Sequence, residues 1–247
     1  MKAWFQKLGQ LLAGKELLER TRLLQNVRRY GVRDPMQYDL DGPTRTLSPL
    51  EVRGLALGGI LAYWNNDTFY QLPPLCPECR APNAESLAQS WGITTPAEAH
   101  QCLQRLGSPG HRQELRQRLK QEPDYWYGLF RQNPFLARRA VSGIAAWDYA
   151  RLANLARWCY DVGYLNWEEA WPYIDQGNHL AQREYDSWES FATGFVAGRL
   201  MWNPGLDSHA EIADVARFLV ESKLSPWRTL PWAPYLPGPG QQAAGTQ

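Results

Sequence analysis

The chain of 247 residues is long enough for one large domain or two small ones, and its hydrophobic fraction of 44% can supply a core. Lysine and arginine together number 26 and aspartate and glutamate 25, so the chain lacks the basic excess of a dedicated nucleic-acid binder. No stretch approaches the roughly 18 unbroken apolar residues that a membrane span needs. Composition therefore excludes an integral membrane protein, a disordered chain and a disulfide scaffold.

The first residues predict a long N-terminal helix and a cytoplasmic location. Polar residues, among them Lys7 and Lys15, interrupt the continuous apolar run of a secretion signal. Leu8, Leu11 and Leu12 instead recur at helical spacing. The 4 cysteines suit a reducing compartment, in which a free thiol behaves as a small hydrophobe.

Helix start signals recur along the chain and predict an irregular, multi-helix, all-α domain. In a capping box, Ser, Thr or Asn at the cap and Glu three residues later satisfy each other's backbone N–H groups. Apolar residues follow at steps of three or four, whereas the alternation typical of strands is weak throughout. Capping boxes are predicted at Ser48, Thr95, Asn166 and Ser208.

Proline and glycine divide the predicted helices into segments. In the C-terminal tail we expect Trp227, Trp232 and Tyr235 to pack on the body and the last residues, Gly238–Gln247, to be disordered. The predicted segments are an N-terminal helical segment at 1–70, a loop rich in proline and cysteine at 71–86, the main helical domain at 87–225 and the Pro-rich tail at 226–247.

Two stretches without periodicity are predicted to be irregular, namely Arg33–Leu47 and Leu72–Asn83. Gly54, Gly58 and Gly59, by contrast, lie within an apolar helical pattern. Close packing between helices is the interpretation we favour for these glycines, because no glycine-rich phosphate loop surrounds them.

Cys76 and Cys79 form a Cys-x-x-Cys pair in a Pro-rich stretch. Two thiolates at this spacing make half of a tetrahedral zinc site, and His100 and Cys102 are the nearest candidates for the other half. A redox pair is a further alternative, although no βαβ pattern surrounds it. We favour two thiols without a ligand, and we predict neither a metal nor another cofactor.

Tryptophan is unusually abundant, with 12 residues in the chain. The interpretation we favour is a core of stacked aromatic rings between helices. The alternative is an aromatic-lined groove for a ligand or a partner, because tryptophan, tyrosine and arginine dominate binding hot spots. The candidates for such a groove are Trp91, Trp147, Trp171, Trp188 and Trp202.

Charged and polar side chains lie beside this aromatic pattern. Asp148 and Arg151 are three residues apart and therefore share a helix face. Tyr185 and Ser187 open a further helix, in which Arg199 follows Ser187 by 12 residues, close to a whole number of turns. We expect these residues to form one buried cluster. The favoured interpretation is a hydrogen-bonded network that fixes helix packing, and the alternative is a catalytic or binding pocket.

Several sequence blocks, taken together and in order, resemble the bacterial domain-of-unknown-function family 1266. The resemblance covers about residues 87–205 and implies a soluble bacterial helical domain, but it implies no activity. The Cys-x-x-Cys pair is not part of the pattern. The blocks are Ser90-Trp91-Gly92-Ile93 with Thr95-Pro96-Ala97-Glu98-Ala99, then Ala146-Trp147-Asp148 with Arg151, Gly163-Tyr164-Leu165 with Glu169-Ala170-Trp171, Tyr185-Asp186-Ser187-Trp188-Glu189 and Gly198-Arg199 with Trp202.

Two classes of function remain open from the sequence. The absence of catalytic motifs, the near-neutral charge and the aromatic excess favour a non-catalytic protein-interaction module, antitoxin-like or secretion-associated, with another protein as partner and neither nucleic acid nor membrane. The alternative is an enzyme or a small-ligand binder. In it Asp148 is an acid or base, Arg151 and Arg199 hold an anionic group, and Tyr185 orients that group.

Overall fold

The computed structural model describes residues 47–65, 72, 77–233 and 235. The predicted N-terminal helix, the predicted loop before Leu47 and the predicted disorder of the last ten residues all fall outside this part of the chain.

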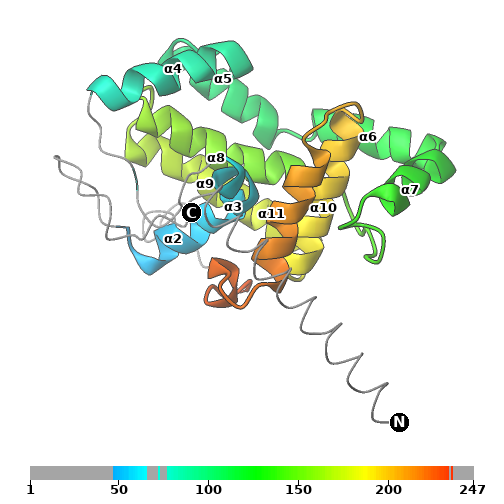
Figure 1. Ribbon diagram of the computed structural model, residues 1–247. Coiled ribbons are helices and arrows are strands. Elements are labelled where there is room, and N and C mark those ends of the chain that lie inside the picture. Colours follow the sequence, from blue (N-terminus) through cyan, green and yellow to red (C-terminus); the bar gives the residue numbers. More distant parts are fainter. Residues whose placement is uncertain (1–46, 66–71, 73–76, 234, 236–247) are drawn as a thin grey trace, which may run out of the picture.

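The described residues form helices and contain no strand, which confirms the all-α prediction (Figure 1). None of these helices has the length and apolarity that a membrane crossing requires. The elements are α2 (Pro49–Leu55), η2 (Ala56–Gly58), α3 (Gly59–Trp64), α4 (Pro77–Trp91), α5 (Pro96–Gly107), α6 (Gly110–Gln121), α7 (Pro123–Gln132), α8 (Ala146–Asp161), α9 (Trp167–Glu184), α10 (Trp188–Trp202), α11 (His209–Glu221) and η3 (Pro226–Arg228).

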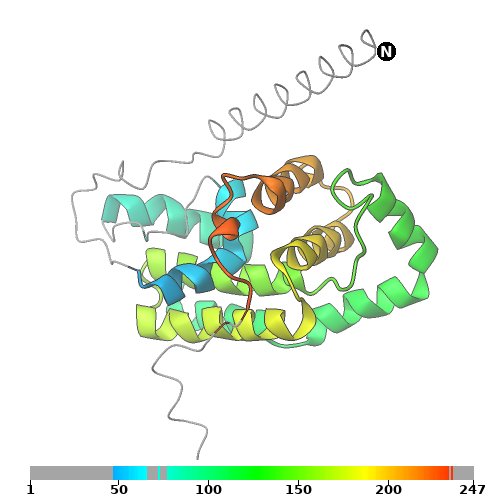
Figure 2. The same cartoon turned by 90° about the horizontal axis from the view of Figure 1, so that it is seen from below.

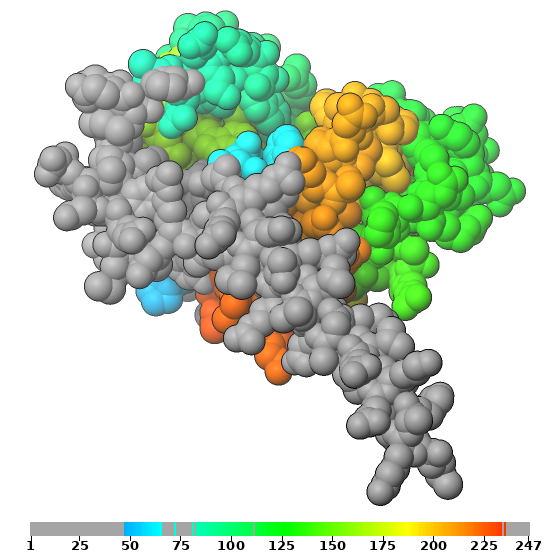
Figure 3. All heavy atoms as spheres, in the orientation of Figure 1, coloured from blue at the N-terminus to red at the C-terminus, as the bar shows by residue number. Residues whose placement is uncertain are grey.

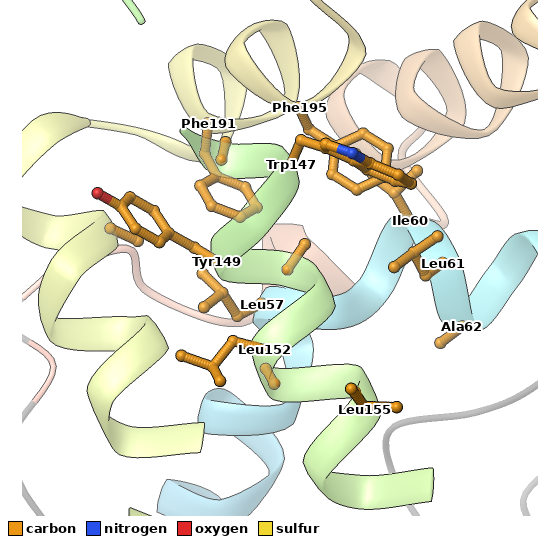
Figure 4. Close-up of a cluster of buried hydrophobic side chains, with 14 of the residues drawn as sticks. Leu57, Ile60, Leu61, Ala62, Trp147, Tyr149, Leu152, Leu155, Phe191 and Phe195 are labelled. Atoms are coloured by element: carbon orange, nitrogen blue, oxygen red, sulfur yellow. The ribbon is translucent and has the colours of Figure 1, made fainter. Parts of the chain in front are cut away.

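Helix α8 lies at the centre of the molecule. It contacts α5, α9, α10 and the short helices α2, η2 and α3, which run between α8 and α11 (Figure 2). Apolar side chains from α3, α8 and α10 meet around it, with Trp147 against Phe195 and Leu152 near Leu57 (Figure 4). Small side chains at 0% exposure allow the neighbouring helices to approach this closely, and they are Ala146, Ala150, Ala153 and Ala156.

Glycines allow neighbouring helices to approach α8 and α9 closely. On Gly58, an added Cβ would lie 2.5 Å from Oδ1 of Asn154 on α8, and on Gly54 it would lie 2.7 Å from the ring of Trp171 on α9. The predicted close packing is therefore confirmed at these two positions. On Gly198 of α10, a Cβ would lie 2.2 Å from the backbone oxygen of Ile144. A backbone atom cannot move aside easily, so this crossing requires glycine.

The first part of the tail packs on the body as predicted, with Trp227, Trp232 and Tyr235 all buried. The Trp227 ring stacks on Trp188 of α10, with centroids 4.4 Å apart. Arg53 of α2 donates a hydrogen bond of 2.5 Å to the backbone oxygen of Trp232. The tail therefore closes the core beside α2 and α10.

Helix α4 corrects the prediction of irregular structure over Leu72–Asn83, because the helix begins at Pro77. Proline is accepted in the first turn, where the backbone N–H has no helical partner anyway. The alanine, glutamate and leucine residues that follow are strong helix formers. Their combined preference outweighs the cost of Pro82 inside the helix.

Three predicted capping boxes are present, at Ser48, Thr95 and Asn166. The box at Ser208 is wrong, although α11 begins after Ser208 as predicted, because this serine makes no cap hydrogen bond. Its Oγ accepts instead from Nη2 of Arg199, at 2.6 Å. A charged guanidinium is a stronger donor than a neutral backbone N–H, so it takes the hydroxyl oxygen.

We predict that Gly198→Ala lowers the free energy of unfolding by about 2–3 kcal/mol, because the methyl group forces α10 away from α8. The matched control is Gly128→Ala on α7, where an added Cβ meets nothing within 4 Å. That change is expected to stabilise the protein by about 0.5–1 kcal/mol through the helix preference of alanine. Urea denaturation measures both, and equal effects at the two positions would contradict the packing assigned to Gly198.

Candidate functional site

A pocket of about 820 Å³ opens between α3, α4, α8 and the end of α10. In the space-filling view, atoms of α3 and α8 are visible in the hollow between α4 and α11 (Figure 3). Its volume falls in the usual range for small-molecule sites, about 300–1,000 Å³. Tryptophan rings form much of its wall, contributed by Trp64, Trp91, Trp147, Trp158 and Trp202.

Helical periodicity explains why these side chains meet. On α8, Trp147, Arg151 and Trp158 follow at steps of four and seven, so they share one face. On α10, Arg199 and Trp202 are one turn apart. Helix α4 presents one continuous face with steps of three and four, made of Asn83, Ser86, Leu87, Ser90 and Trp91.

Arg151 is held in the wall of the pocket by charge and by aromatic rings. Its Nη2 donates to Oδ1 of Asp148, and both residues are buried, as predicted for this pair. The guanidinium carbon lies 4.6 Å from the ring centroid of Trp147, 5.7 Å from that of Trp91 and 5.9 Å from that of Trp202. Burial lowers the pKa of Arg151, and the neighbouring Asp148 carboxylate opposes this shift.

Arg199 is buried more deeply, at 3% exposure, and its surroundings differ. It donates from Nη1 to Nδ1 of His209 at 3.1 Å and from Nη2 to the Ser208 hydroxyl, both neutral groups. Within the described part of the chain, no carboxylate lies within the 4 Å of an ion pair with Arg199. Burial lowers the pKa of Arg199 to about 10, and the negative charge of Glu211 partly opposes this shift. The group therefore remains cationic at neutral pH.

The Trp147 ring lies close to both guanidinium groups, with its centroid 4.6 Å from the guanidinium carbon of Arg151 and 5.8 Å from that of Arg199. Nε1 of Trp147, Nε of Arg151 and Nε of Arg199 are all buried donors without a hydrogen-bond partner among the described residues. Buried donors normally find an acceptor, because leaving one unpaired costs about 1–3 kcal/mol. These three donors therefore set this part of the described structure apart from an ordinary core.

The structure divides the predicted polar cluster. Asp148, Arg151 and Arg199 gather around Trp147, whereas Ser187 caps the far end of α10. Twelve residues of helix separate Ser187 from Arg199 by about 18 Å along the axis, although both lie on similar faces. The hydroxyl of Tyr185 accepts from the backbone N–H of Ala146 at 3.0 Å, outside the pocket lining, and burial raises its pKa.

The predicted aromatic groove is also divided. Trp91, Trp147 and Trp202 line the pocket, but Trp171 packs on Trp167 and Trp188 stacks on Trp227. Sequence reasoning did not assign Trp64, Trp158 and Arg105 to the site, although they line it. Both tryptophans follow the apolar periodicity of their helices, which does not distinguish a pocket wall from a core.

The candidate metal ligands do not meet within the described residues. Nδ1 of His100 lies 2.9 Å from the Tyr173 hydroxyl, and the buried thiol of Cys102 accepts from Arg105 at 3.5 Å. The described part of the chain contains no group of three or more histidine, cysteine, aspartate or glutamate side chains that could hold a metal ion. Cys76 and the side chain of Cys79 lie outside that part, so the favoured interpretation of two thiols without a ligand and the zinc alternative both stay untested.

Fold and pocket together define an all-helical protein with a tryptophan- and arginine-lined pocket at one side of its central helix. The chain belongs to the family described as Protein of unknown function (DUF1266), which matches residues 86–232. The resemblance predicted for residues 87–205 is thereby confirmed, and the match extends into the tail. No curated protein and no solved structure matches the chain.

The contacts of His209 predict a pH dependence of stability. Arg199 donates to its Nδ1, so its Nε2 carries the proton and donates to the backbone oxygen of Asn203 at 2.8 Å. Burial and the Arg199 charge lower the pKa of His209 below its ordinary value of 6.5. The folded state therefore favours the neutral ring, and this contribution to stability is present above pH 6.5 and is lost as the pH falls through the lowered pKa.

We expect the free energy of unfolding to fall between pH 7 and pH 5, and we expect His209→Asn to reduce that fall. Urea denaturation across this pH range measures the difference. A variant with the same pH slope as the wild type would show that His209 does not hold Arg199 in the manner described.

Proposed function

We propose that this protein binds a small organic anion in the pocket and does so without catalysing a reaction on it. The observation that carries the proposal is Arg199, a buried cation at the pocket wall whose hydrogen-bond partners among the described residues are the neutral groups of Ser208 and His209. A buried charge normally has a partner of opposite sign, because desolvation of an unpaired ion is costly. A bound anion supplies that partner.

The second guanidinium supports the same assignment. Arg151 is oriented by Asp148 and lines the same pocket, next to Trp147. Arginine presents several donors in a fixed plane, which suits the two oxygens of a carboxylate or the three of a phosphate. Arg105 lines the pocket as well and adds positive charge nearer to solvent.

Binding without catalysis is favoured over the enzyme alternative because the candidate catalytic groups are engaged in contacts within the protein. Asp148, the candidate acid or base, accepts from Arg151 and does not line the pocket. Asp161, a carboxylate that does line the pocket, is ion-paired with Arg157 at 3.4 Å. Both ring nitrogens of His209 make contacts within the protein. Tyr185, the candidate orienting group, binds the start of α8 instead. Of the enzyme alternative, we therefore keep the proposal that Arg151 and Arg199 hold an anionic group, and we do not keep Asp148 as an acid or base.

The protein-interaction module is the second candidate. It is favoured by two tyrosines on α7, because Tyr125 is 54% exposed and Tyr127 is 39% exposed, and tyrosine is enriched in binding hot spots. A cytoplasmic location belongs to either proposal, and it fits the buried free thiols of Cys102 and Cys159.

Thermal unfolding of the full-length chain tests the anion site. Citrate, phosphate and benzoate are compared with chloride at equal ionic strength and pH 7.5. We expect at least one of them to raise Tm above the value in chloride, since a ligand at 100 times its Kd stabilises the native state by about 2.7 kcal/mol. Arg199→Met should abolish the shift.

The matched control is Arg116→Met, because Arg116 pairs with Glu184 at 2.7 Å on the surface, outside the pocket lining. This variant should retain the anion-dependent shift. The proposal is wrong if no anion exceeds chloride, or if Arg199→Met retains the full shift.

A further inference from the structure

The tryptophan that is exposed among the described residues lies at the pocket. Trp202 ends α10 and is 44% exposed, whereas Trp147, in contact with it, is buried. Indole carries a large apolar surface, and an exposed indole beside a cavity offers a flat face that a ligand can cover. Trp64, Trp91 and Trp158 are half-buried around the same cavity. Much of the wall that a ligand would meet is therefore aromatic.

The anion-binding and aromatic parts of the pocket adjoin each other. The guanidinium carbon of Arg151 lies 5.7 Å from the ring centroid of Trp91 and 5.9 Å from that of Trp202. An acidic group that pairs with Arg151 in the pocket therefore has indole rings nearby, and the atoms attached to that acidic group can reach them.

We propose that the ligand carries a flat unsaturated ring close to its acidic group, with the ring on Trp202 and Trp91 and the acid at Arg151 and Arg199. This inference rests on the proposed function, since it specifies the anion that the pocket takes. Flat rings stack on indole or meet it edge to face, which a saturated ring of equal size does less well. The cavity of about 820 Å³ has room for a ring system together with its acid.

Aromatic carboxylates and nucleotides share this chemistry. The polar part of the lining contains Asn65, Asn83, Ser86 and Ser208, which suit the hydroxyl groups of a sugar as well as the second oxygen of a carboxylate. Aromatic carboxylates and nucleotides are therefore tested side by side in one experiment.

Isothermal titration calorimetry of the full-length chain uses indole-3-acetate as the aromatic carboxylate and adenosine 5′-monophosphate as the nucleotide. Each has one control without a flat ring, cyclohexylacetate or ribose 5-phosphate, and one control without the acid, indole-3-acetamide or adenosine. We expect at least one flat-ring acid to bind with a Kd below 1 mM and at least tenfold more tightly than both of its controls. The acid that binds identifies the source.

Trp202→Leu should weaken that binding at least tenfold, while Tyr125→Leu, an equally exposed aromatic position outside the pocket lining, should leave it unchanged within twofold. Equal affinity for the acid without a flat ring, or an unchanged affinity in Trp202→Leu, overturns the ring inference and leaves the anion site standing. If none of the four acids binds with a Kd below 1 mM, the ring inference is overturned, and the anion-dependent shift in Tm decides separately whether the anion site stands.

Discussion

Desolvation of two guanidinium groups beside one indole ring is the constraint on which the candidate site depends. Trp147 lies close to Arg151 and to Arg199, and both arginines are buried among tryptophan rings. Arg151 has Asp148 as its counter-ion, but Arg199 is surrounded by neutral partners and by a more distant Glu211. The difference between the two arginines marks where a ligand charge would be most favourable.

The same helices that build the core bring these arginines together. Gly198 lets α10 approach the start of α8 until backbone and side chain touch, and the next residue, Arg199, is thereby placed against Trp147. Helix α8 also packs against α9 and against the short helices α2, η2 and α3. Because core packing sets the position of the pocket wall, changes far from the pocket can alter it.

Local rules predicted much of the fold and only part of the site. The capping boxes at Ser48, Thr95 and Asn166 and the pair Asp148–Arg151 depend on residues three apart, and each is present. The box at Ser208 failed because a distant residue, Arg199, takes its hydroxyl. A long-range competitor of this kind leaves no mark in the local sequence.

Periodicity also has a limit that the predicted polar cluster shows. It identifies residues on the same face of a helix, as for Ser187 and Arg199, but not their separation along the axis, which here puts Ser187 outside the site. Periodicity also does not show which helices face one another. That Trp64 and Trp158 line the pocket is therefore visible only in the packing of α3 and α4 around α8.

The most direct test of this account is the free energy of unfolding of Arg199→Met and Asp148→Asn in the absence of added ligand. Arg199→Met removes a buried charge that has no carboxylate within ion-pair distance among the described residues, so it should change stability by less than about 1 kcal/mol or increase it. Asp148→Asn leaves Arg151 buried without its counter-ion and should cost about 3–5 kcal/mol. A large loss in Arg199→Met, comparable to that in Asp148→Asn, would show that Arg199 serves the fold and would contradict its assignment to a ligand.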